Sequence, residues 1–189
     1  MKGIHLFLAN GFEDMEALAT RDVLVRGGVP VITVSITDEY LVESSHGLQV
    51  TADTSWADLE VMEPGTSAED VMIFPGGMPG SKNLAAHAEL IEILQDHWNR
   101  GGAVAAICAA RGLVVSQLPG LSGKRFTCFP GFEEALIGQG AVPEKEGVVT
   151  DGNLITGRSA GWAVEFGMAI LTYLKGEEAA AKVRAGLML

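Results

Sequence analysis

Short apolar runs rich in β-forming residues alternate along this chain with longer segments whose apolar residues recur three and four positions apart. The runs expected to be strands are Gly3–Leu8, Pro30–Ile36, Val71–Phe74, Ala103–Ile107 and Leu154–Thr156. The segments with helical spacing are Ala17–Leu24, Leu84–Trp98 and Ala163–Leu174. Strands that alternate with helices favour a parallel sheet covered on both faces. The sequence therefore predicts an α/β sandwich with right-handed crossovers.

Two shorter segments depart from this alternation. Tyr40–Val42 and Leu48–Thr51 flank a polar stretch, a pattern that predicts a β-hairpin. Glu63–Ser67 is expected to be a loop, too short to link two domains. Because the chain has 189 residues and no internal repeat, we expect one domain that spans residues 1–189.

Charge and composition exclude several classes of partner. The chain has 13 Lys and Arg against 24 Asp and Glu, which gives a formal net charge of −11. Binding to nucleic acid or to an anionic membrane surface is therefore disfavoured. The longest apolar run, around Ala103–Ala110, is far shorter than the roughly 18 residues that a membrane span requires. Since the first residues also lack the pattern of a cleaved signal peptide, we expect a cytoplasmic protein.

Cys108 has the clearest chemical context in the sequence. It directly follows the predicted strand Ala103–Ile107 and precedes a segment of helical period, so the thiol is expected at a strand-to-helix turn. Ala106 and Ala110 are small, as close approach of the strand and helix backbones requires. Amide groups at the start of a helix stabilise an anion. We therefore expect a lowered pKa and a reactive thiolate, the alternative being an inert buried cysteine.

Other residues can complete a site at the same edge of the sheet, where strands end. Gly76 and Gly77 follow the strand that ends at Phe74, and their amides and that of Ala109 form a candidate oxyanion hole. A plain turn is the alternative for the two glycines. Glu16 lies one turn inside the first predicted helix, where a partly buried carboxylic acid could stay protonated and donate to the sulfur.

Three further patterns carry weaker expectations. Asn10 and Glu13 fit a capping box at the start of the first helix. A strand that ends at Thr127 is expected to bring the next residues to the same edge of the sheet. None of the four histidines has metal-ligand spacing to another His or to Cys, so no metal is expected. Cys128 and Cys108 lack C-x-x-C spacing, and each is expected to be a reduced thiol.

Four segments together resemble the ThiJ/PfpI superfamily, within it the branch of the parkinsonism-associated protein deglycase: Gly11–Glu16, Phe74–Gly77, Ala105–Ala110 and Thr127–Glu133. The resemblance continues in order from Lys2 to about Leu187. It implies a flavodoxin-like sandwich, usually dimeric, in which Cys108 is the nucleophile beside a protonated Glu16. It also implies Gly77 and Ala109 as the oxyanion donors.

The same resemblance implies a range of activities. They include cofactor-free conversion of methylglyoxal to lactate, removal of early glycation adducts, oxidation of the cysteine to sulfinic acid as a stress signal, and holdase chaperoning. Some members of the superfamily are peptidases or amidases that use a Cys–His pair. The resemblance therefore implies a shared nucleophile and leaves the reaction open.

Three positions depart from the family's pattern. Phe129 stands where many relatives have His, which weakens the peptidase interpretation. Trp162 lies where Gly-Pro-Gly-Thr is common, and is expected to reshape the pocket. Arg111 replaces a small residue or Pro in the first turn of the elbow helix, where a cation costs about 0.3–1 kcal/mol. We expect a carboxylate partner or an anionic substrate for Arg111, the alternative being a solvated side chain.

Three functions are consistent with these residues. The first is a cofactor-free, thiol-dependent enzyme that acts on small reactive carbonyls or glycated adducts, with Cys108 as nucleophile and Glu16 as proton shuttle. The second is an oxidative-stress sensor or holdase whose Cys108 oxidises to sulfinate without turnover. The third, amide hydrolysis, needs a base that the sequence does not display. A homodimer is expected, and Arg26 and His46 are candidate residues of its surface.

Overall fold

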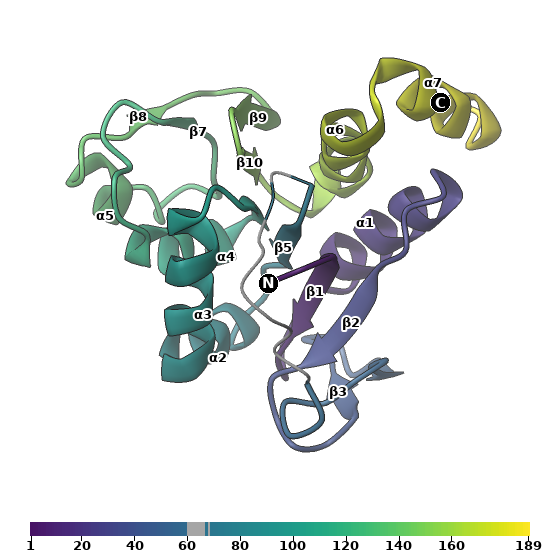
Figure 1. Ribbon diagram of the computed structural model, residues 1–189, viewed down its shortest axis with the longest axis horizontal. Helices are drawn as coiled ribbons and strands as arrows, with labels where there is room; N and C mark the ends of the chain where they lie inside the picture. Colours follow the sequence, from purple (N-terminus) through teal and green to yellow (C-terminus); the bar gives the residue numbers. More distant parts are fainter. Residues whose placement is uncertain (60–66, 68) are drawn as a thin grey trace.

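The computed structural model describes residues 1–59, 67 and 69–189, so the predicted loop Glu63–Ser67 lies outside the described residues except at its last position. A six-stranded sheet in the order β2-β1-β5-β6-β10-β9 forms the centre (Figure 1). Its strands are β1 (Ile4–Leu8), β2 (Ile32–Ser35), β5 (Val71–Phe74), β6 (Ala103–Ile107), β9 (Val148–Asp151) and β10 (Leu154–Gly157). All neighbouring strands are parallel except β10 and β9, which are antiparallel at one edge. The predicted α/β fold with a mainly parallel sheet is confirmed.

Helices cover both faces of this sheet (Figure 1). They are α1 (Asp14–Arg26), α2 (Gly80–Ala86), α3 (Ala88–Asn99), α4 (Ala109–Leu113), α5 (Glu134–Ile137), α6 (Ala163–Lys175) and α7 (Glu177–Gly186), with 3₁₀ turns η1 (Val115–Gln117) and η2 (Ala160–Trp162). Successive residues of a strand point to opposite faces, so Phe7 packs in one buried cluster with Leu90 of α3. Leu6 packs in the other cluster, with Val23 of α1. Within the part of the chain that the structure describes, no helix is both long and apolar enough to cross a bilayer.

The segment Leu84–Trp98, expected to be helical throughout, is divided at His87. The backbone of His87 is extended, with φ −81° and ψ 95°, and its side chain accepts a hydrogen bond from the amide of Leu90 at 3.3 Å. The periodicity of the apolar residues continues across the break because α2 and α3 pack on the same face of the sheet. The expectation of one continuous helix is therefore wrong.

Two small sheets flank the central one. The predicted hairpin is confirmed as β3 (Leu41–Glu43) and β4 (Gln49–Thr51). The second small sheet pairs β7 (Arg125–Phe126) with β8 (Val142–Pro143), so the strand expected to end at Thr127 lies outside the central sheet. Thr127 still reaches the sheet, since its amide donates to Oγ1 of Thr156 in β10 at 3.1 Å.

The start of α1 differs from the predicted capping box. The N-cap is Glu13, whose carboxylate accepts from the amide of Glu16 at 2.7 Å. Asn10 instead accepts from the amide of Glu43 in the hairpin at 2.9 Å. The predicted capping role of Asn10 is wrong because its side chain is hydrogen bonded to the hairpin, which is distant in sequence. The helix consequently begins at Asp14.

Candidate active site

Cys108 lies at the turn between β6 and α4. Its backbone has φ 60° and ψ −129°, and Met188 is the only other non-glycine residue of the described chain with a positive φ. Such a conformation is strained for a residue with a Cβ and persists only where the surrounding structure imposes it. Here the amide of Cys108 donates to the carbonyl of Gly157 at 2.9 Å. The predicted strand-to-helix elbow is confirmed.

Glu16 of α1 reaches this elbow from a different part of the chain. It is 1% exposed, and its Oε2 accepts from the amide of Gly76 at 2.7 Å. A Cβ on Gly76 would lie 2.4 Å from Oε2 of Glu16 and 3.2 Å from Sγ of Cys108. Only a residue without a side chain therefore fits between these groups, and the carboxyl of Glu16 lies close enough to the thiol to raise its pKa.

Two backbone amides also point at the sulfur. The N–H groups of Ala109 and Gly77 lie near the sulfur of Cys108 and oppose the rise of its pKa. Gly77 has φ +91°, and a Cβ there would lie 2.4 Å from the amide nitrogen of Glu13. The N–H of Gly76 is engaged by Glu16, so this group is not free to serve the oxyanion role that we expected.

The electrostatics of the thiol differ from the sequence-based expectation. Burial raises the pKa of Cys108 to about 12, and the neighbouring Glu16 contributes to the rise. Burial also raises the pKa of Glu16 to about 7. The expected lowering of the thiol pKa is wrong, because the desolvation of the sulfur outweighs the two amides. As the groups are in contact, they titrate as a pair that loses one proton near neutral pH and retains the other.

We next compared the chain with known protein families and structures. The model of the DJ-1/PfpI family matches residues 2–173. The chain belongs to the DJ-1/PfpI family. "Protein dj-1beta" of Drosophila melanogaster is 34% identical over 188 residues, covering 100% of this chain and 97% of that protein.

Further members of the DJ-1/PfpI family are similar over most of the chain. "Glutathione-independent glyoxalase DJR-1.2" of Caenorhabditis elegans is 30% identical over 166 residues, which cover 88% of this chain and 84% of that protein. The solved structure of oxidized Toxoplasma gondii DJ-1 aligns with a TM-score of 0.88 at 27% identity, covering 98% of this chain and 97% of that chain. The family supports a DJ-1-type function for this chain.

Among the described residues of this DJ-1/PfpI chain, Arg111 has neither the carboxylate ion pair nor the solvated position that the sequence left open. Its side chain is fully buried, so the solvated alternative is wrong. Its Nη1 donates to the carbonyl of Thr127 at 2.6 Å, and the guanidinium carbon lies 3.5 Å from the ring centre of Phe126. Among the described residues no carboxylate forms an ion pair with it. Burial lowers the pKa of Arg111 to about 9.

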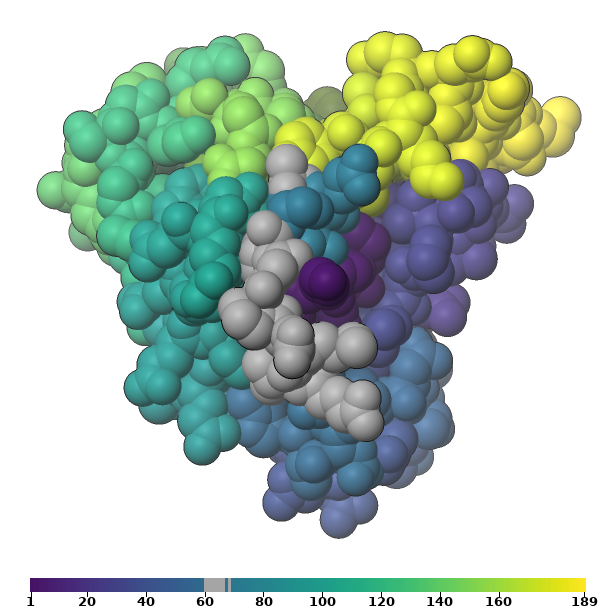
Figure 2. Space-filling view, in the orientation of Figure 1, coloured from purple at the N-terminus to yellow at the C-terminus, as the bar shows by residue number. Residues whose placement is uncertain are grey.

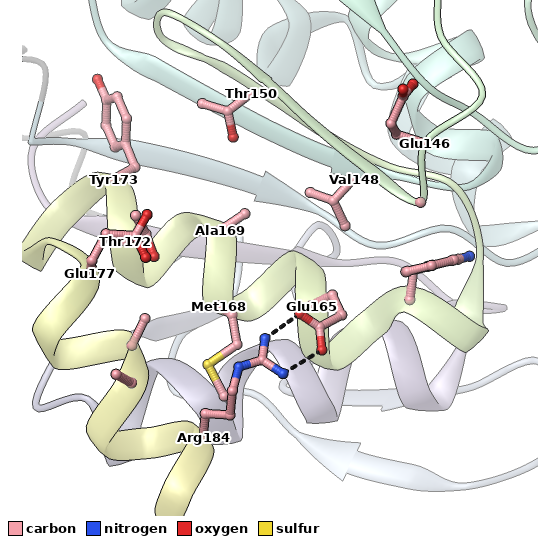
Figure 3. Close-up of a pocket in the computed structure, with 14 residues that line it drawn as sticks. Glu146, Val148, Thr150, Glu165, Met168, Ala169, Thr172, Tyr173, Glu177 and Arg184 are labelled. Atoms are coloured by element: carbon pink, nitrogen blue, oxygen red, sulfur yellow. Dashed lines mark hydrogen bonds and ion pairs between the residues drawn. The ribbon is translucent and has the colours of Figure 1, made fainter. Parts of the chain in front are cut away.

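The two aromatic candidates, Phe129 and Trp162, have different surroundings. Phe129 is 44% exposed and packs edge-on to Phe132, with 6.5 Å between the ring centres. Trp162 lines a groove of about 880 Å³ between β9 and the helices α6 and α7, and its ring covers Gly147. Figure 2 shows this hollow beside the C-terminal helices, and Figure 3 shows the ion pair of Arg184 with Glu165 on its floor. Cys108 is not among the residues that line this groove.

One group of potential metal ligands, which the sequence did not reveal, lies at the start of α1. Ligand atoms of Glu13, Asp14 and His46 all lie within 4.8 Å of one another. Each already has a partner, because Glu13 caps the helix and Asp14 pairs with His46 at 2.5 Å. We therefore assign no metal to this group. Sequence spacing could not reveal it, because the hairpin supplies His46 from 32 residues away.

Proposed function

We propose that this chain is a cysteine-dependent, cofactor-free enzyme that converts 2-oxoaldehydes or glycated adducts of that class to 2-hydroxy acids. The contact of the buried Glu16 carboxyl with the thiol of Cys108, at a strained elbow, is the observation that carries the proposal. The C. elegans relative named a glutathione-independent glyoxalase supports this class of reaction.

The first step of the proposed reaction uses the proton that the pair shares. When this proton lies on Glu16, the sulfur of Cys108 is an anion held by the amides of Gly77 and Ala109. The sulfur adds to the aldehyde carbon, a C–S bond forms, and the carbonyl oxygen takes the proton from Glu16 to give a hemithioacetal. The same two amides are the nearest donors for the oxygen anion that develops during this addition.

In the second step Glu16 transfers a proton within the substrate. Its carboxylate removes the hydrogen from the former aldehyde carbon and returns it to the adjacent carbon, while the hydroxyl proton moves from the first oxygen to the second, which gives a thioester of the 2-hydroxy acid. Water then hydrolyses the thioester and regenerates the thiol. Because one carbon is oxidised while its neighbour is reduced, the substrate exchanges electrons with itself and no external carrier is required.

Production of lactate from methylglyoxal tests this proposal. We expect lactate from the purified wild-type protein and none above background from Cys108→Ser. Cys128→Ser is the matched control, since it removes the other thiol and should retain the activity. Equal lactate from wild type and Cys108→Ser would refute the proposal, provided that circular dichroism shows both to be folded.

Oxidation of Cys108 without turnover is the second candidate. It is favoured by Oε1 of Glu16, which is buried and has no N–H or O–H partner among the described residues. A protonated carboxyl there could donate to an oxygen of a Cys108 sulfinate. No lactate, together with two oxygens added to Cys108 by peroxide, would favour this candidate. Amide hydrolysis has less support, since no described histidine contacts the thiol.

We further propose that the chain forms a homodimer. Exposed apolar residues on α1 and on the hairpin region support a contact there: Met15, Leu18, Val25, Leu41 and Leu48. His46 pairs with Asp14 and Arg26 with Asp22, so both candidate surface residues have partners within this chain. Light scattering on the purified protein would distinguish a dimer from a monomer.

A further inference from the structure

Arg111 is a buried cation whose hydrogen-bonding groups are largely unused. Only Nη1 has an acceptor, the carbonyl of Thr127, while Nε and Nη2 have no partner among the described residues. The Phe126 ring lies against the flat face of the guanidinium and cannot accept these in-plane N–H groups as a carboxylate would. Burial of a cation with unpaired donors is unfavourable, so a compensating anion is expected nearby.

The sulfur of Cys128 is the candidate for that anion. The carbonyl that Arg111 binds belongs to Thr127, so the guanidinium lies beside the peptide unit that leads into Cys128. Cys128 is also the ionisable group whose charge most strongly favours the protonated form of Arg111, followed by Glu133. The Glu133 carboxylate is engaged with the amide of Gly131 at 2.6 Å.

The geometry favours an anion formed in place over one that binds from solution. The unpaired Nε and Nη2 of Arg111 are shielded from solvent, so a dissolved anion would have to displace protein to reach them. The thiol of Cys128 is only partly buried, which leaves it open to a small oxidant.

We propose that Cys128 is a second oxidisable thiol, distinct from Cys108, and that the buried Arg111 holds its oxidised, anionic form. The co-reactant is a hydroperoxide such as hydrogen peroxide. The Cys128 thiolate attacks one peroxide oxygen, an S–O bond forms, the O–O bond breaks, and the departing hydroxide takes the proton to leave sulfenate and water. A second peroxide converts the sulfenate to sulfinate and water in the same way, so each step oxidises sulfur by two electrons.

The role of Arg111 lies mainly with the product. Burial raises the pKa of the Cys128 thiol, and the positive charges of Arg111 and Arg158 oppose that rise. The thiol is therefore mostly protonated at neutral pH, and its oxidation is expected to be slow. A sulfinate, by contrast, is fully ionised at neutral pH and offers two acceptor oxygens to the unpaired donors of Arg111.

Peptide mapping of the peroxide-treated protein tests this proposal. Trypsin cuts after Lys124 and Arg125, so Cys108 and Cys128 fall on different peptides and are scored separately. In wild type we expect two added oxygens on Cys128. In Arg111→Met, which replaces the cation with an apolar chain, the amount of sulfinate formed in a fixed time should fall about tenfold or more, because the transition state that leads to the anion loses a hydrogen bond to a charged group. Equal yields in the two proteins, or an unmodified Cys128 in wild type, would overturn the proposal.

A melting experiment keeps the proposal testable if Arg111→Met fails to fold. In a Cys108→Ser background only Cys128 remains to be oxidised, and its sulfinate should raise Tm by supplying the missing anion for Arg111. Cys128→Ser in the same background controls for oxidation of other residues and should show no rise. A Tm that stays constant or falls when Cys128 is oxidised contradicts the inference.

Discussion

The two cysteines of this chain are both partly buried thiols, but Cys108 has an acidic neighbour and Cys128 a basic one. Cys108 contacts the carboxyl of Glu16, which can give and take a proton near neutral pH. Cys128 lies beside the guanidinium of Arg111, which keeps its charge and has unpaired donors. A mobile proton suits a thiol that must add to a carbonyl and then leave, whereas a permanent cation suits a thiol whose oxidised product persists. The charged neighbour, Glu16 or Arg111, thus gives the two thiols different expected chemistry, although their burial is similar.

Backbone geometry reinforces this difference. Cys108 occupies a strained conformation with φ 60°, in which the amides of Gly77 and Ala109 lie near its sulfur. Cys128 has no positive φ, and its segment follows a strand that lies outside the central sheet. Of the two cysteines, only Cys108 therefore has a strained backbone, as expected for a reacting centre.

Exchange of the charged neighbours should have the largest effect. Glu16→Gln keeps the size of the side chain but cannot transfer a proton, so we expect lactate formation to fall by about 10²–10⁴-fold. Arg111→Met should reduce it by less than about tenfold, since the guanidinium is not hydrogen bonded to Cys108. Steady-state kinetics on both variants measures the contrast. If the losses are similar, the two thiols are not functionally separate.

The pH dependence of the unfolding free energy tests the role of Glu16, the acidic neighbour of Cys108. The pKa of Glu16 is raised from 4.5 to about 7, so the folded protein binds this proton more tightly than the unfolded chain. The resulting stabilisation is complete below pH 4.5 and is lost as the pH rises through about 7, with a size on the order of 3 kcal/mol. Glu16→Gln should lack this decline. Urea unfolding of both proteins from pH 4.5 to 8 measures it, and parallel curves would contradict the assignment.

Crowding at the contact of acid and thiol should have a moderate effect. In Gly76→Ala the new Cβ would lie 2.4 Å from Oε2 of Glu16 and 2.7 Å from Cβ of Cys108. We expect a loss of about 1–3 kcal/mol in unfolding free energy and reduced lactate formation. Gly161→Ala is the matched control, because nothing lies within 4 Å of its Cβ position and its φ is not positive. The control should stay within about 0.5 kcal/mol of wild type.

Substitution of Trp162 should have the smallest effect. Trp162→Leu alters the groove between β9 and the C-terminal helices, whose lining does not include Cys108. Lactate formation should therefore remain within about twofold of wild type. A larger loss, in a variant with unchanged Tm, would place the indole in the reaction after all.

The fold was largely predictable because its signals are local. The strands Val71–Phe74 and Ala103–Ile107 have the predicted bounds, since each is an uninterrupted apolar run that the sheet buries on both faces. The elbow at Cys108 follows from the same pattern. The division at His87 was not predictable from periodicity, because the apolar spacing continues through it.

The environment of the site was less predictable because tertiary contacts decide it. The side chain of Asn10 accepts a hydrogen bond from Glu43 of the hairpin. Arg111 is buried against Phe126 and Thr127, which follow it in the sequence. The direction of the Cys108 pKa shift was predicted wrongly, since the sequence displays the helix amides but not the desolvation of the sulfur. Residue types and their order thus indicated which groups meet, whereas the pKa shifts of these groups depend on burial, which only the tertiary structure shows.

The hairpin of β3 and β4 is joined to the segment that leads into α1. The amide of Gly11 donates to the carbonyl of Glu43, and the amide of Ser45 donates to the carbonyl of Phe12, each at 2.7 Å. Glu13, the residue after Phe12, caps the turn that carries Glu16. A molecule that binds and displaces the hairpin would therefore also shift the start of α1 and, with it, the carboxyl of Glu16, without contacting Cys108.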